Sequence, residues 1–211
     1  MRRDWWVPLT GVAFVALALV AVFVGGEPPD ADSPVQEIVD HYRDSENAIF
    51  AGALLLGLAG TLLIFFAGVL RKVLREAEGE GGVLSLVAFA GAVVLAIGAA
   101  IDGTISIALA DKADTIDPAA VQALQALWDN DFLPLAMGTA VFLFASGLSI
   151  VRHAALPKWL GWAAILFAVI SLTPIGFAGF IGGAVWILVV SVLLTLKFRG
   201  HDASPSTRPA T

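Results

Sequence analysis

Asp102 is the residue of this chain whose type and position point most directly to chemistry. It is the only ionisable side chain inside the long apolar run 83–110. A carboxylate at membrane depth is costly, and it often marks a proton relay, a cation site or a polar contact to a substrate. A rise of about 1.5 Å per residue puts Asp102 roughly 28 Å from Val83, near the far edge of a hydrocarbon core about 30 Å thick. A structural carboxylate, hydrogen-bonded at a helix interface, also fits this position.

Small and polar residues lie near Asp102 on the same predicted helix. Gly98 and Ser106 stand four residues to either side of it, and Thr104 is two residues away. Small residues allow helices to pack closely, so this spacing directs Asp102 into a bundle. Trp186 lies within another apolar run, where its indole N–H needs a partner in a neighbouring helix or in a polar cavity. The candidate polar site inside the membrane therefore comprises Asp102, Thr104, Ser106 and Trp186, although helix packing alone also accounts for Trp186.

His41 forms a second candidate group with Asp40 and Asp44, which share one face of a short predicted helix. An imidazole beside carboxylates can bind a divalent cation, whereas a single histidine in an acid-rich loop is more often a solvated surface group. No histidine occurs in any apolar run, which argues against a haem buried between two histidines. The chain has no cysteine, which excludes thiol catalysis and iron–sulfur centres. We therefore assign no catalytic residue and expect no cofactor.

The apolar runs that must position these residues are typical of a membrane protein. The chain has 211 residues, 58% of them hydrophobic and 14% charged, and its mean hydropathy is +0.87. The final uncharged run, 159–196, is nearly twice one span and contains break signals at Thr173–Gly176. We expect one domain, 1–199, followed by a disordered cytoplasmic tail, 200–211. The predicted fold is an all-α, polytopic transmembrane bundle with six spans: 5–26, 48–70, 83–110, 132–151, 157–175 and 177–196.

Lysine and arginine indicate the orientation of these spans, because the cytoplasmic flanks of membrane helices are enriched in them. With six spans and a cytoplasmic N-terminus, the outer loops contain only Arg43 and Lys112. Both termini are therefore predicted to be cytoplasmic. The remaining basic residues then lie on the cytoplasmic side: Arg2, Arg3, Arg71, Lys72, Arg75, Arg152, Lys158, Lys197, Arg199 and Arg208.

Acidic residues concentrate in the two predicted outer loops, so the formal net charge of −6 faces outwards. Each loop contains the pattern of a short amphipathic helix. In the first, Ser33 is the expected N-cap, Pro34 the first helical residue and Gln36 the end of a capping box. In the second, Asp117 and Pro118 are expected to begin the helix. The basic flanks are scattered rather than gathered on one face, which argues against nucleic acid as a partner.

The connection between the fourth and fifth predicted spans carries a resemblance to a known group of proteins. Residues 152–162 read RHAALPKWLGW, a basic start followed by Leu-Pro-Lys-Trp-Leu-Gly. This segment is similar to a connection found in small bacterial multi-pass membrane proteins grouped as a domain of unknown function, and the resemblance extends mainly from the third span onwards. It implies a protein of the bacterial cytoplasmic membrane. It implies no activity and no functional residue.

The favoured function is structural or accessory, exercised through helix packing and the acidic outer loops, without enzymatic activity. The first alternative is a small-solute or proton-coupled transporter that uses Asp102. The second is a membrane enzyme at the outer surface, with Asp102, His41 or the pair Asp129 and Asp131 as acid and base. The expected partners are the lipid bilayer and, through glycine-lined helix faces, a second copy or another membrane protein.

Overall fold

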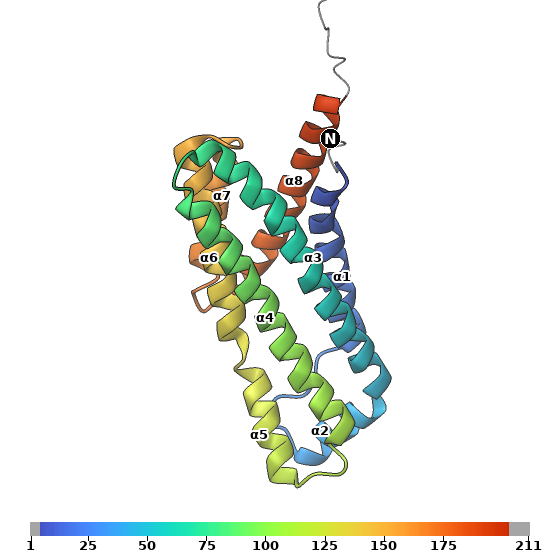
Figure 1. Cartoon of the computed structure of the whole chain (residues 1–211). Helices are drawn as coiled ribbons and strands as arrows, with labels where there is room; N and C mark the ends of the chain where they lie inside the picture. Colours follow the sequence, from blue (N-terminus) through green and yellow to red (C-terminus); the bar gives the residue numbers. More distant parts are fainter. Residues whose placement is uncertain (1–4, 203–211) are drawn as a thin grey trace, which may run out of the picture.

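The computed structural model describes residues 5–202, and the regular secondary structure in that range is helical throughout. Figure 1 shows the helices as an elongated bundle, with α2 and α5 at the end opposite the termini. The helices are η1 Val7–Leu9, α1 Thr10–Gly25, α2 Val35–Asp44, α3 Glu46–Glu78, α4 Val83–Lys112, α5 Pro118–Asp129, α6 Phe132–His153, α7 Lys158–Ile170 and α8 Gly176–Asp202.

Five helical segments of the described chain are long and apolar enough to cross a membrane. The fourth of them combines α5 and α6, which are separated by a break at Asn130 and Asp131. The predicted all-α class is thus confirmed, together with five of the long apolar helices expected of a membrane bundle. The segments are Val7–Gly25, Glu46–Glu78, Val83–Lys112, Pro118–His153 and Gly176–Gly200.

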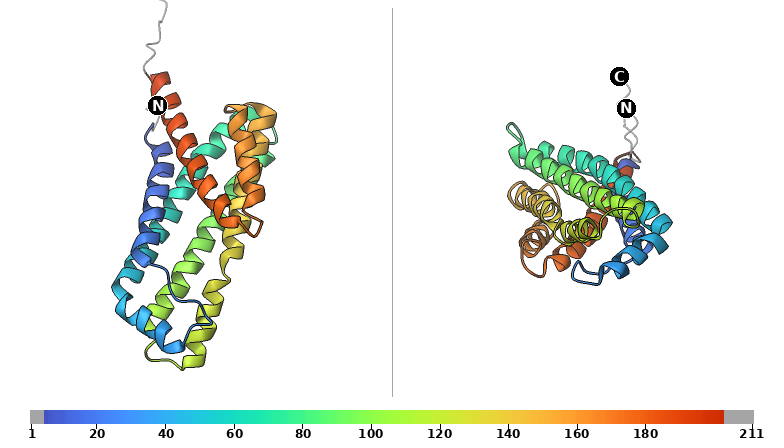
Figure 2. Two further views of the ribbon diagram at one scale, coloured as in Figure 1. Left: turned by 180° about the vertical axis from the view of Figure 1, so that it is seen from behind. Right: turned by 90° about the horizontal axis from the view of Figure 1, so that it is seen from below.

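Helix α7 differs from the other predicted spans in its length. It has 13 residues, so it is about 20 Å long against a hydrocarbon core of about 30 Å. A turn through Ser171–Ile175 joins it to α8, within the region where the sequence predicts a hairpin. Figure 2 shows the tip of this α7–α8 hairpin part-way along the bundle. The first arm of the hairpin is therefore shorter than the predicted span 157–175.

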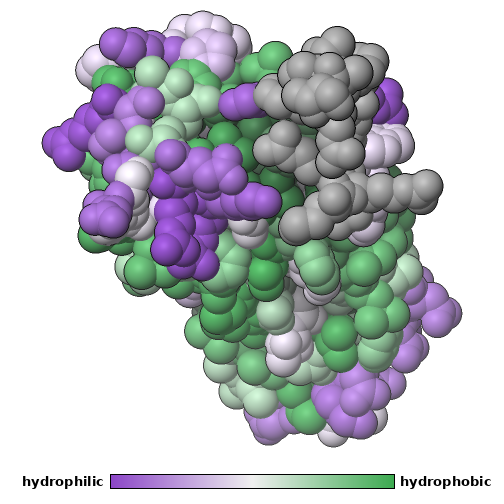
Figure 3. Space-filling model, turned by 45° about the horizontal axis from the view of Figure 1, so that its top comes forward, coloured by the Kyte–Doolittle hydropathy of each residue, from purple (hydrophilic) through white to green (hydrophobic). Residues whose placement is uncertain are grey.

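Charge separates along the bundle. The first and last described helices meet at the end where α3 finishes and α4 begins (Figure 1). In the space-filling view, an apolar band separates the polar surfaces of the two ends (Figure 3). The end that carries the termini also carries most of the basic residues of the described chain: Arg71, Lys72, Arg75, Arg152, Lys158, Lys197 and Arg199.

Some of the predictions fall on residues that the structure does not describe. Arg2, Arg3 and Arg208, which contribute to the predicted cytoplasmic charge, lie outside the described residues. So does 203–211, the greater part of the predicted tail. Helix α8 continues to Asp202, past the position where the tail was expected to start.

Glycine determines how closely α4 and α6 approach. A Cβ atom added at Gly91 or Gly98 would meet the backbone of α6, and one added at Gly138 would meet the backbone of α4. The two helices therefore touch along their backbones, as small residues allow in membrane bundles. The α4 face that the sequence predicts to pack closely does so.

The buried hydrophobic residues form two clusters. The larger one occupies the part of the bundle towards the termini, and Phe66, Phe142 and Trp186 are its largest buried side chains. The smaller one includes Ile38, Tyr42 and Val121, and it holds α2 and α5 against the ends of α3 and α4. We call this assembly of α2, α5 and the adjoining ends of α3 and α4 the α2–α5 cap.

The start of α2 differs from its prediction, while the start of α5 agrees. Ser33 does not cap α2, because the helix begins at Val35 and Ser33 lies one residue before the N-cap; its backbone N–H closes a turn with the carbonyl of Asp30. Pro34 has an extended ψ of 130° and is itself the N-cap, so the predicted capping box is wrong. At α5 the carboxylate of Asp117 accepts a hydrogen bond of 2.8 Å from the backbone N–H of Ala119, as expected for an N-cap.

Candidate functional site

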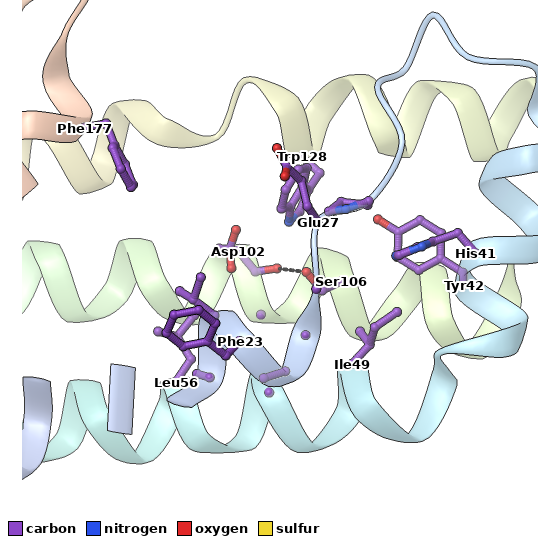
Figure 4. Close-up of a pocket in the computed structure, with 18 residues that line it drawn as sticks. Phe23, Glu27, His41, Tyr42, Ile49, Leu56, Asp102, Ser106, Trp128 and Phe177 are labelled. Atoms are coloured by element: carbon purple, nitrogen blue, oxygen red, sulfur yellow. Dashed lines mark hydrogen bonds between the residues drawn. The ribbon is translucent and has the colours of Figure 1, made fainter. Parts of the chain in front are cut away.

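A cavity of about 650 Å³ lies between the larger hydrophobic cluster and the α2–α5 cap. Its walls come from the end of α1, the linker to α2, the helices α2 to α5 and the first turn of α8 (Figure 4). The lining is mostly apolar. A volume of this size and a mainly apolar lining are typical of small-molecule sites. The polar and ionisable side chains of the lining are Glu27, His41, Tyr42, Asp102, Ser106 and Trp128.

Asp102 lies on the α4 wall of this cavity and is partly buried. The ion pairs found between residues 5 and 202 join Arg43 to Asp40 and Asp44, and Lys112 to Asp111. None of them includes Asp102. Its negative charge is therefore not neutralised by a lysine or arginine of the described chain.

Two of the polar groups of the lining interact with Asp102. In Figure 4 the side chain of Asp102 extends from α4 towards α5, the helix that carries Trp128. The indole N–H of Trp128 is buried and interacts with the Asp102 carboxylate, but it lacks a hydrogen bond of regular geometry. The hydroxyl of Ser106 donates to the backbone carbonyl of Asp102 at 3.0 Å, which leaves its oxygen free to accept. The cavity therefore offers a ligand one acceptor, the hydroxyl oxygen of Ser106, and one donor, the indole N–H of Trp128.

A chain of hydrogen bonds fixes the boundary between the cavity and the cap. The Tyr42 hydroxyl donates to Oε1 of Gln125 at 2.8 Å, and Nε2 of Gln125 donates to Asp129 at 2.9 Å. The second oxygen of Asp129 accepts from the backbone N–H of Ala31 at 2.9 Å. Burial, and then the charges of Asp129 and Asp102, raise the pKa of Tyr42. Tyr42 therefore stays a neutral donor and ties the α1–α2 linker to the cap.

His41 lines the cavity, whereas the two aspartates predicted to join it do not. Its Nε2 is buried and has no hydrogen-bond partner among the described residues. Burial lowers the pKa of His41, so the ring carries no charge near neutral pH. Asp40 and Asp44 instead pair with Arg43 at the exposed surface. Residues 5–202 contain no group of three or more metal-ligating side chains placed to hold a metal ion.

The structure divides the predicted polar site. Asp102 and Ser106 share the cavity, but Thr104 is exposed and donates to the backbone carbonyl of Ala100 at 2.7 Å. Trp186 is buried in the larger cluster and donates its indole N–H to the carbonyl of Leu160 at 2.8 Å. Trp186 thus packs between helices. This is the alternative that the sequence allowed to a place in the polar site.

The predicted acid and base residues are not assembled into pairs. Asp129 is engaged with Gln125 and Ala31 in the cap. No hydrogen bond of the described chain joins Asp102, His41, Asp129 or Asp131 to one another. General acid–base catalysis needs such groups within hydrogen-bond reach of one substrate position. In the described chain these residues therefore form no hydrogen-bonded acid–base pair.

Sequence reasoning missed Trp128 and Phe177 as residues of the cavity that Asp102 also lines. Trp128 resembles an aromatic residue at the membrane interface, and Phe177 resembles an ordinary lipid-facing residue after a turn. One signal was available for Trp128, because Val121, Gln125 and Trp128 recur at helical spacing and define one face of α5. That face turns towards the bundle, where Val121 and Gln125 are buried.

Comparison of the chain with models of known protein families, with curated proteins and with solved structures gives no match. The resemblance carried by residues 152–162 therefore stays a prediction. The function has to be argued from the cavity.

Proposed function

We propose that this protein is a small-solute or proton-coupled transporter in which Asp102 holds the proton or cation. The observation that supports it is the place of Asp102, on the wall of a cavity of about 650 Å³ and without a basic partner in the described chain. Keeping such a carboxylate at membrane depth is costly, and proton or cation binding explains why it is there. A purely structural role needs neither the cavity nor the unpaired carboxylate.

The residues that line the cavity belong to the half of the bundle that ends in the α2–α5 cap. Towards the termini, the buried side chains of Phe66, Phe142 and Trp186 fill the space between the helices. A transporter exposes its site to the two sides of the membrane in turn. In our proposal this arrangement is the state in which the site is reached from the outer half of the membrane, and the closed half must open in the next step.

The orientation is part of the proposal: six spans, the α7–α8 hairpin supplying the last two, and both termini on the cytoplasmic side of a bacterial membrane. Basic residues at the end that carries the termini support it. The chain has no cysteine, so single-cysteine variants give a clean test. In intact cells we expect a membrane-impermeant maleimide to label Asp44→Cys and Asp114→Cys. Glu80→Cys should react only after permeabilisation, and the reverse pattern would contradict the orientation.

Proton flux tests the role of Asp102. In proteoliposomes with an imposed pH gradient, we expect Asp102→Asn to lower flux by about tenfold or more, because the amide keeps the shape of the carboxylate but binds no proton. Asp111→Asn is the matched control, since Asp111 is an exposed carboxylate on the same helix. Equal flux through the wild-type protein and Asp102→Asn would refute the proposed role of this residue.

A structural or accessory role is the second candidate, and the acidic surface of the cap favours it. Absence of proton and monovalent-cation flux from both the wild-type protein and Asp102→Asn would make this role the better explanation. The exposed carboxylates of the cap and of the linkers that adjoin it are Glu27, Asp30, Asp32, Glu37, Asp44, Glu46, Asp111, Asp114, Asp117 and Asp129.

A further inference from the structure

The mouth of the cavity opens on the apolar band of the protein. Three of the lining residues, Phe23, Phe177 and Val22, have exposed fractions of 83%, 75% and 68%. Such exposure of large apolar side chains at membrane depth is expected where a protein meets lipid. On the side of the cap, Glu27 and Pro28 of the linker border the cavity. The opening is therefore lateral, towards the membrane.

The short hairpin explains why this opening exists. Because α7 has only 13 residues, the tip of the α7–α8 hairpin stops part-way along the bundle (Figure 2). Between this tip and the α2–α5 cap, neither α7 nor α8 covers the outer part of α4 (Figure 2). Leu172 and Ile175 at the tip are exposed and apolar, and Phe177 follows at the cavity mouth. The tip thus forms one edge of a lateral entrance that leads to Asp102.

The side chains around the cavity suit an organic cation. Asp102 and Glu27 supply negative charge, and the lining contains neither lysine nor arginine. Tyr42, Trp128 and Phe177 supply aromatic groups, whose faces attract cations. A hard metal ion would need several oxygen ligands close together, and the two carboxylates of this lining stand on separate elements in mostly apolar surroundings.

We propose that the cavity binds a lipophilic monovalent cation, such as a hydrophobic amine or an onium ion, which enters sideways from the membrane beneath the tip of the α7–α8 hairpin. This inference rests on the proposed transport function and names its substrate class. The cationic centre lies against Asp102 and Trp128. The apolar groups of the ligand lie against Phe23 and Phe177 at the mouth.

Two ions of the same shape and opposite charge test this assignment. Radiolabelled tetraphenylphosphonium is titrated onto the full chain in lipid nanodiscs, with empty nanodiscs as the measure of lipid partitioning. We expect saturable binding of tetraphenylphosphonium that the unlabelled ion displaces. Tetraphenylborate, its anionic counterpart, is titrated in separate samples, because the two ions pair with each other, and it should show no saturable binding. Saturable binding of both ions alike, or of neither, would overturn the proposal.

Variants locate the bound cation. Asp102→Asn is expected to weaken phosphonium binding by about tenfold, because a desolvated charge pair is lost. Asp102→Glu should retain most of the affinity, and Trp128→Leu should lose several-fold without any change in charge. Thr104→Val is the matched control, since Thr104 lies on the same helix but outside the cavity. If Asp102→Asn proves unstable, the comparison of Trp128→Leu with Thr104→Val decides, and equal affinities for these two would overturn the assignment.

The two proposals fail in different ways. Proton flux that depends on Asp102, together with no saturable phosphonium binding, would overturn the substrate class and retain the transport function. Loss of both signals would overturn both proposals. Phosphonium binding that depends on Asp102 without any flux would keep the site and contradict transport.

Discussion

Replacement of Gly138 by leucine is expected to separate α4 from α6 and to give a protein that unfolds or aggregates on extraction. A Cβ at this position would overlap the backbone of Leu95, which cannot rotate away as a side chain can. Overpacking of a core usually costs about 1–3 kcal/mol, and a backbone obstacle puts this case at or above the upper value. The measurement is the Tm in detergent, with the monodispersity of the extracted protein.

Gly57→Leu provides the control for this prediction. Gly57 lies in α3, another of the long apolar helices, and a Cβ added there would meet no atom within 4 Å. The same chemical change on an open surface should alter stability by about 0.5 kcal/mol or less. If the two variants melted at the same temperature, the backbone contact between α4 and α6 would not be a determinant of the fold.

Trp186→Ala is expected to lower the free energy of unfolding by about 3–5 kcal/mol, as for other large aromatic residues removed from a core. Trp186 is buried, bonds the carbonyl of Leu160, and packs edge-to-face on Phe142 with ring centroids 6.0 Å apart. Its loss leaves a cavity between α6, α7 and α8. Thermal or denaturant unfolding in detergent measures the effect.

Trp186→Phe separates packing from function. The phenyl ring keeps most of the apolar contact but removes the indole N–H that bonds the carbonyl of Leu160, at a cost of about 0.5–1.5 kcal/mol. Because Trp186 lies outside the cavity lining, proton flux by the folded variant should equal that of the wild-type protein. A stable Trp186→Phe protein without flux would show that this residue belongs to the transport path.

The sequence was informative about the long helices and less so about the hairpin. Apolar run lengths identify α1, α3, α4 and α6, because hydropathy depends on composition alone. The same criterion treats 157–175 as one span, although Ser171 and Pro174 belong to the turn that ends α7 at Ile170. The length of a helix depends on where its backbone hydrogen bonds stop, and local polar and proline residues decide that.

The candidate site, like the fold, could be predicted from the sequence only in part. Asp102 was recognisable because a lone carboxylate in an apolar run is unusual. Thr104 was grouped with it by proximity in sequence, but two residues along a helix turn the side chain to a different face, and Thr104 is exposed. The contact between Tyr42 and Gln125 joins segments far apart in the chain. Long-range pairs of this kind depend on tertiary packing, which no local pattern in one sequence encodes.

The difference in length between α7 and its neighbours also affects the surrounding lipid. Beside α3 and α4, a bilayer meets helices of 33 and 30 residues, whereas beside α7 it meets 13. Acyl chains on that flank must tilt or shorten to fill the space beyond Ile170, so the protein imposes a hydrophobic mismatch on one side only. Mismatch costs fractions of a kcal/mol per Å and sorts proteins between membranes of different thickness. Local thinning of the bilayer beside α7 should therefore relieve this mismatch.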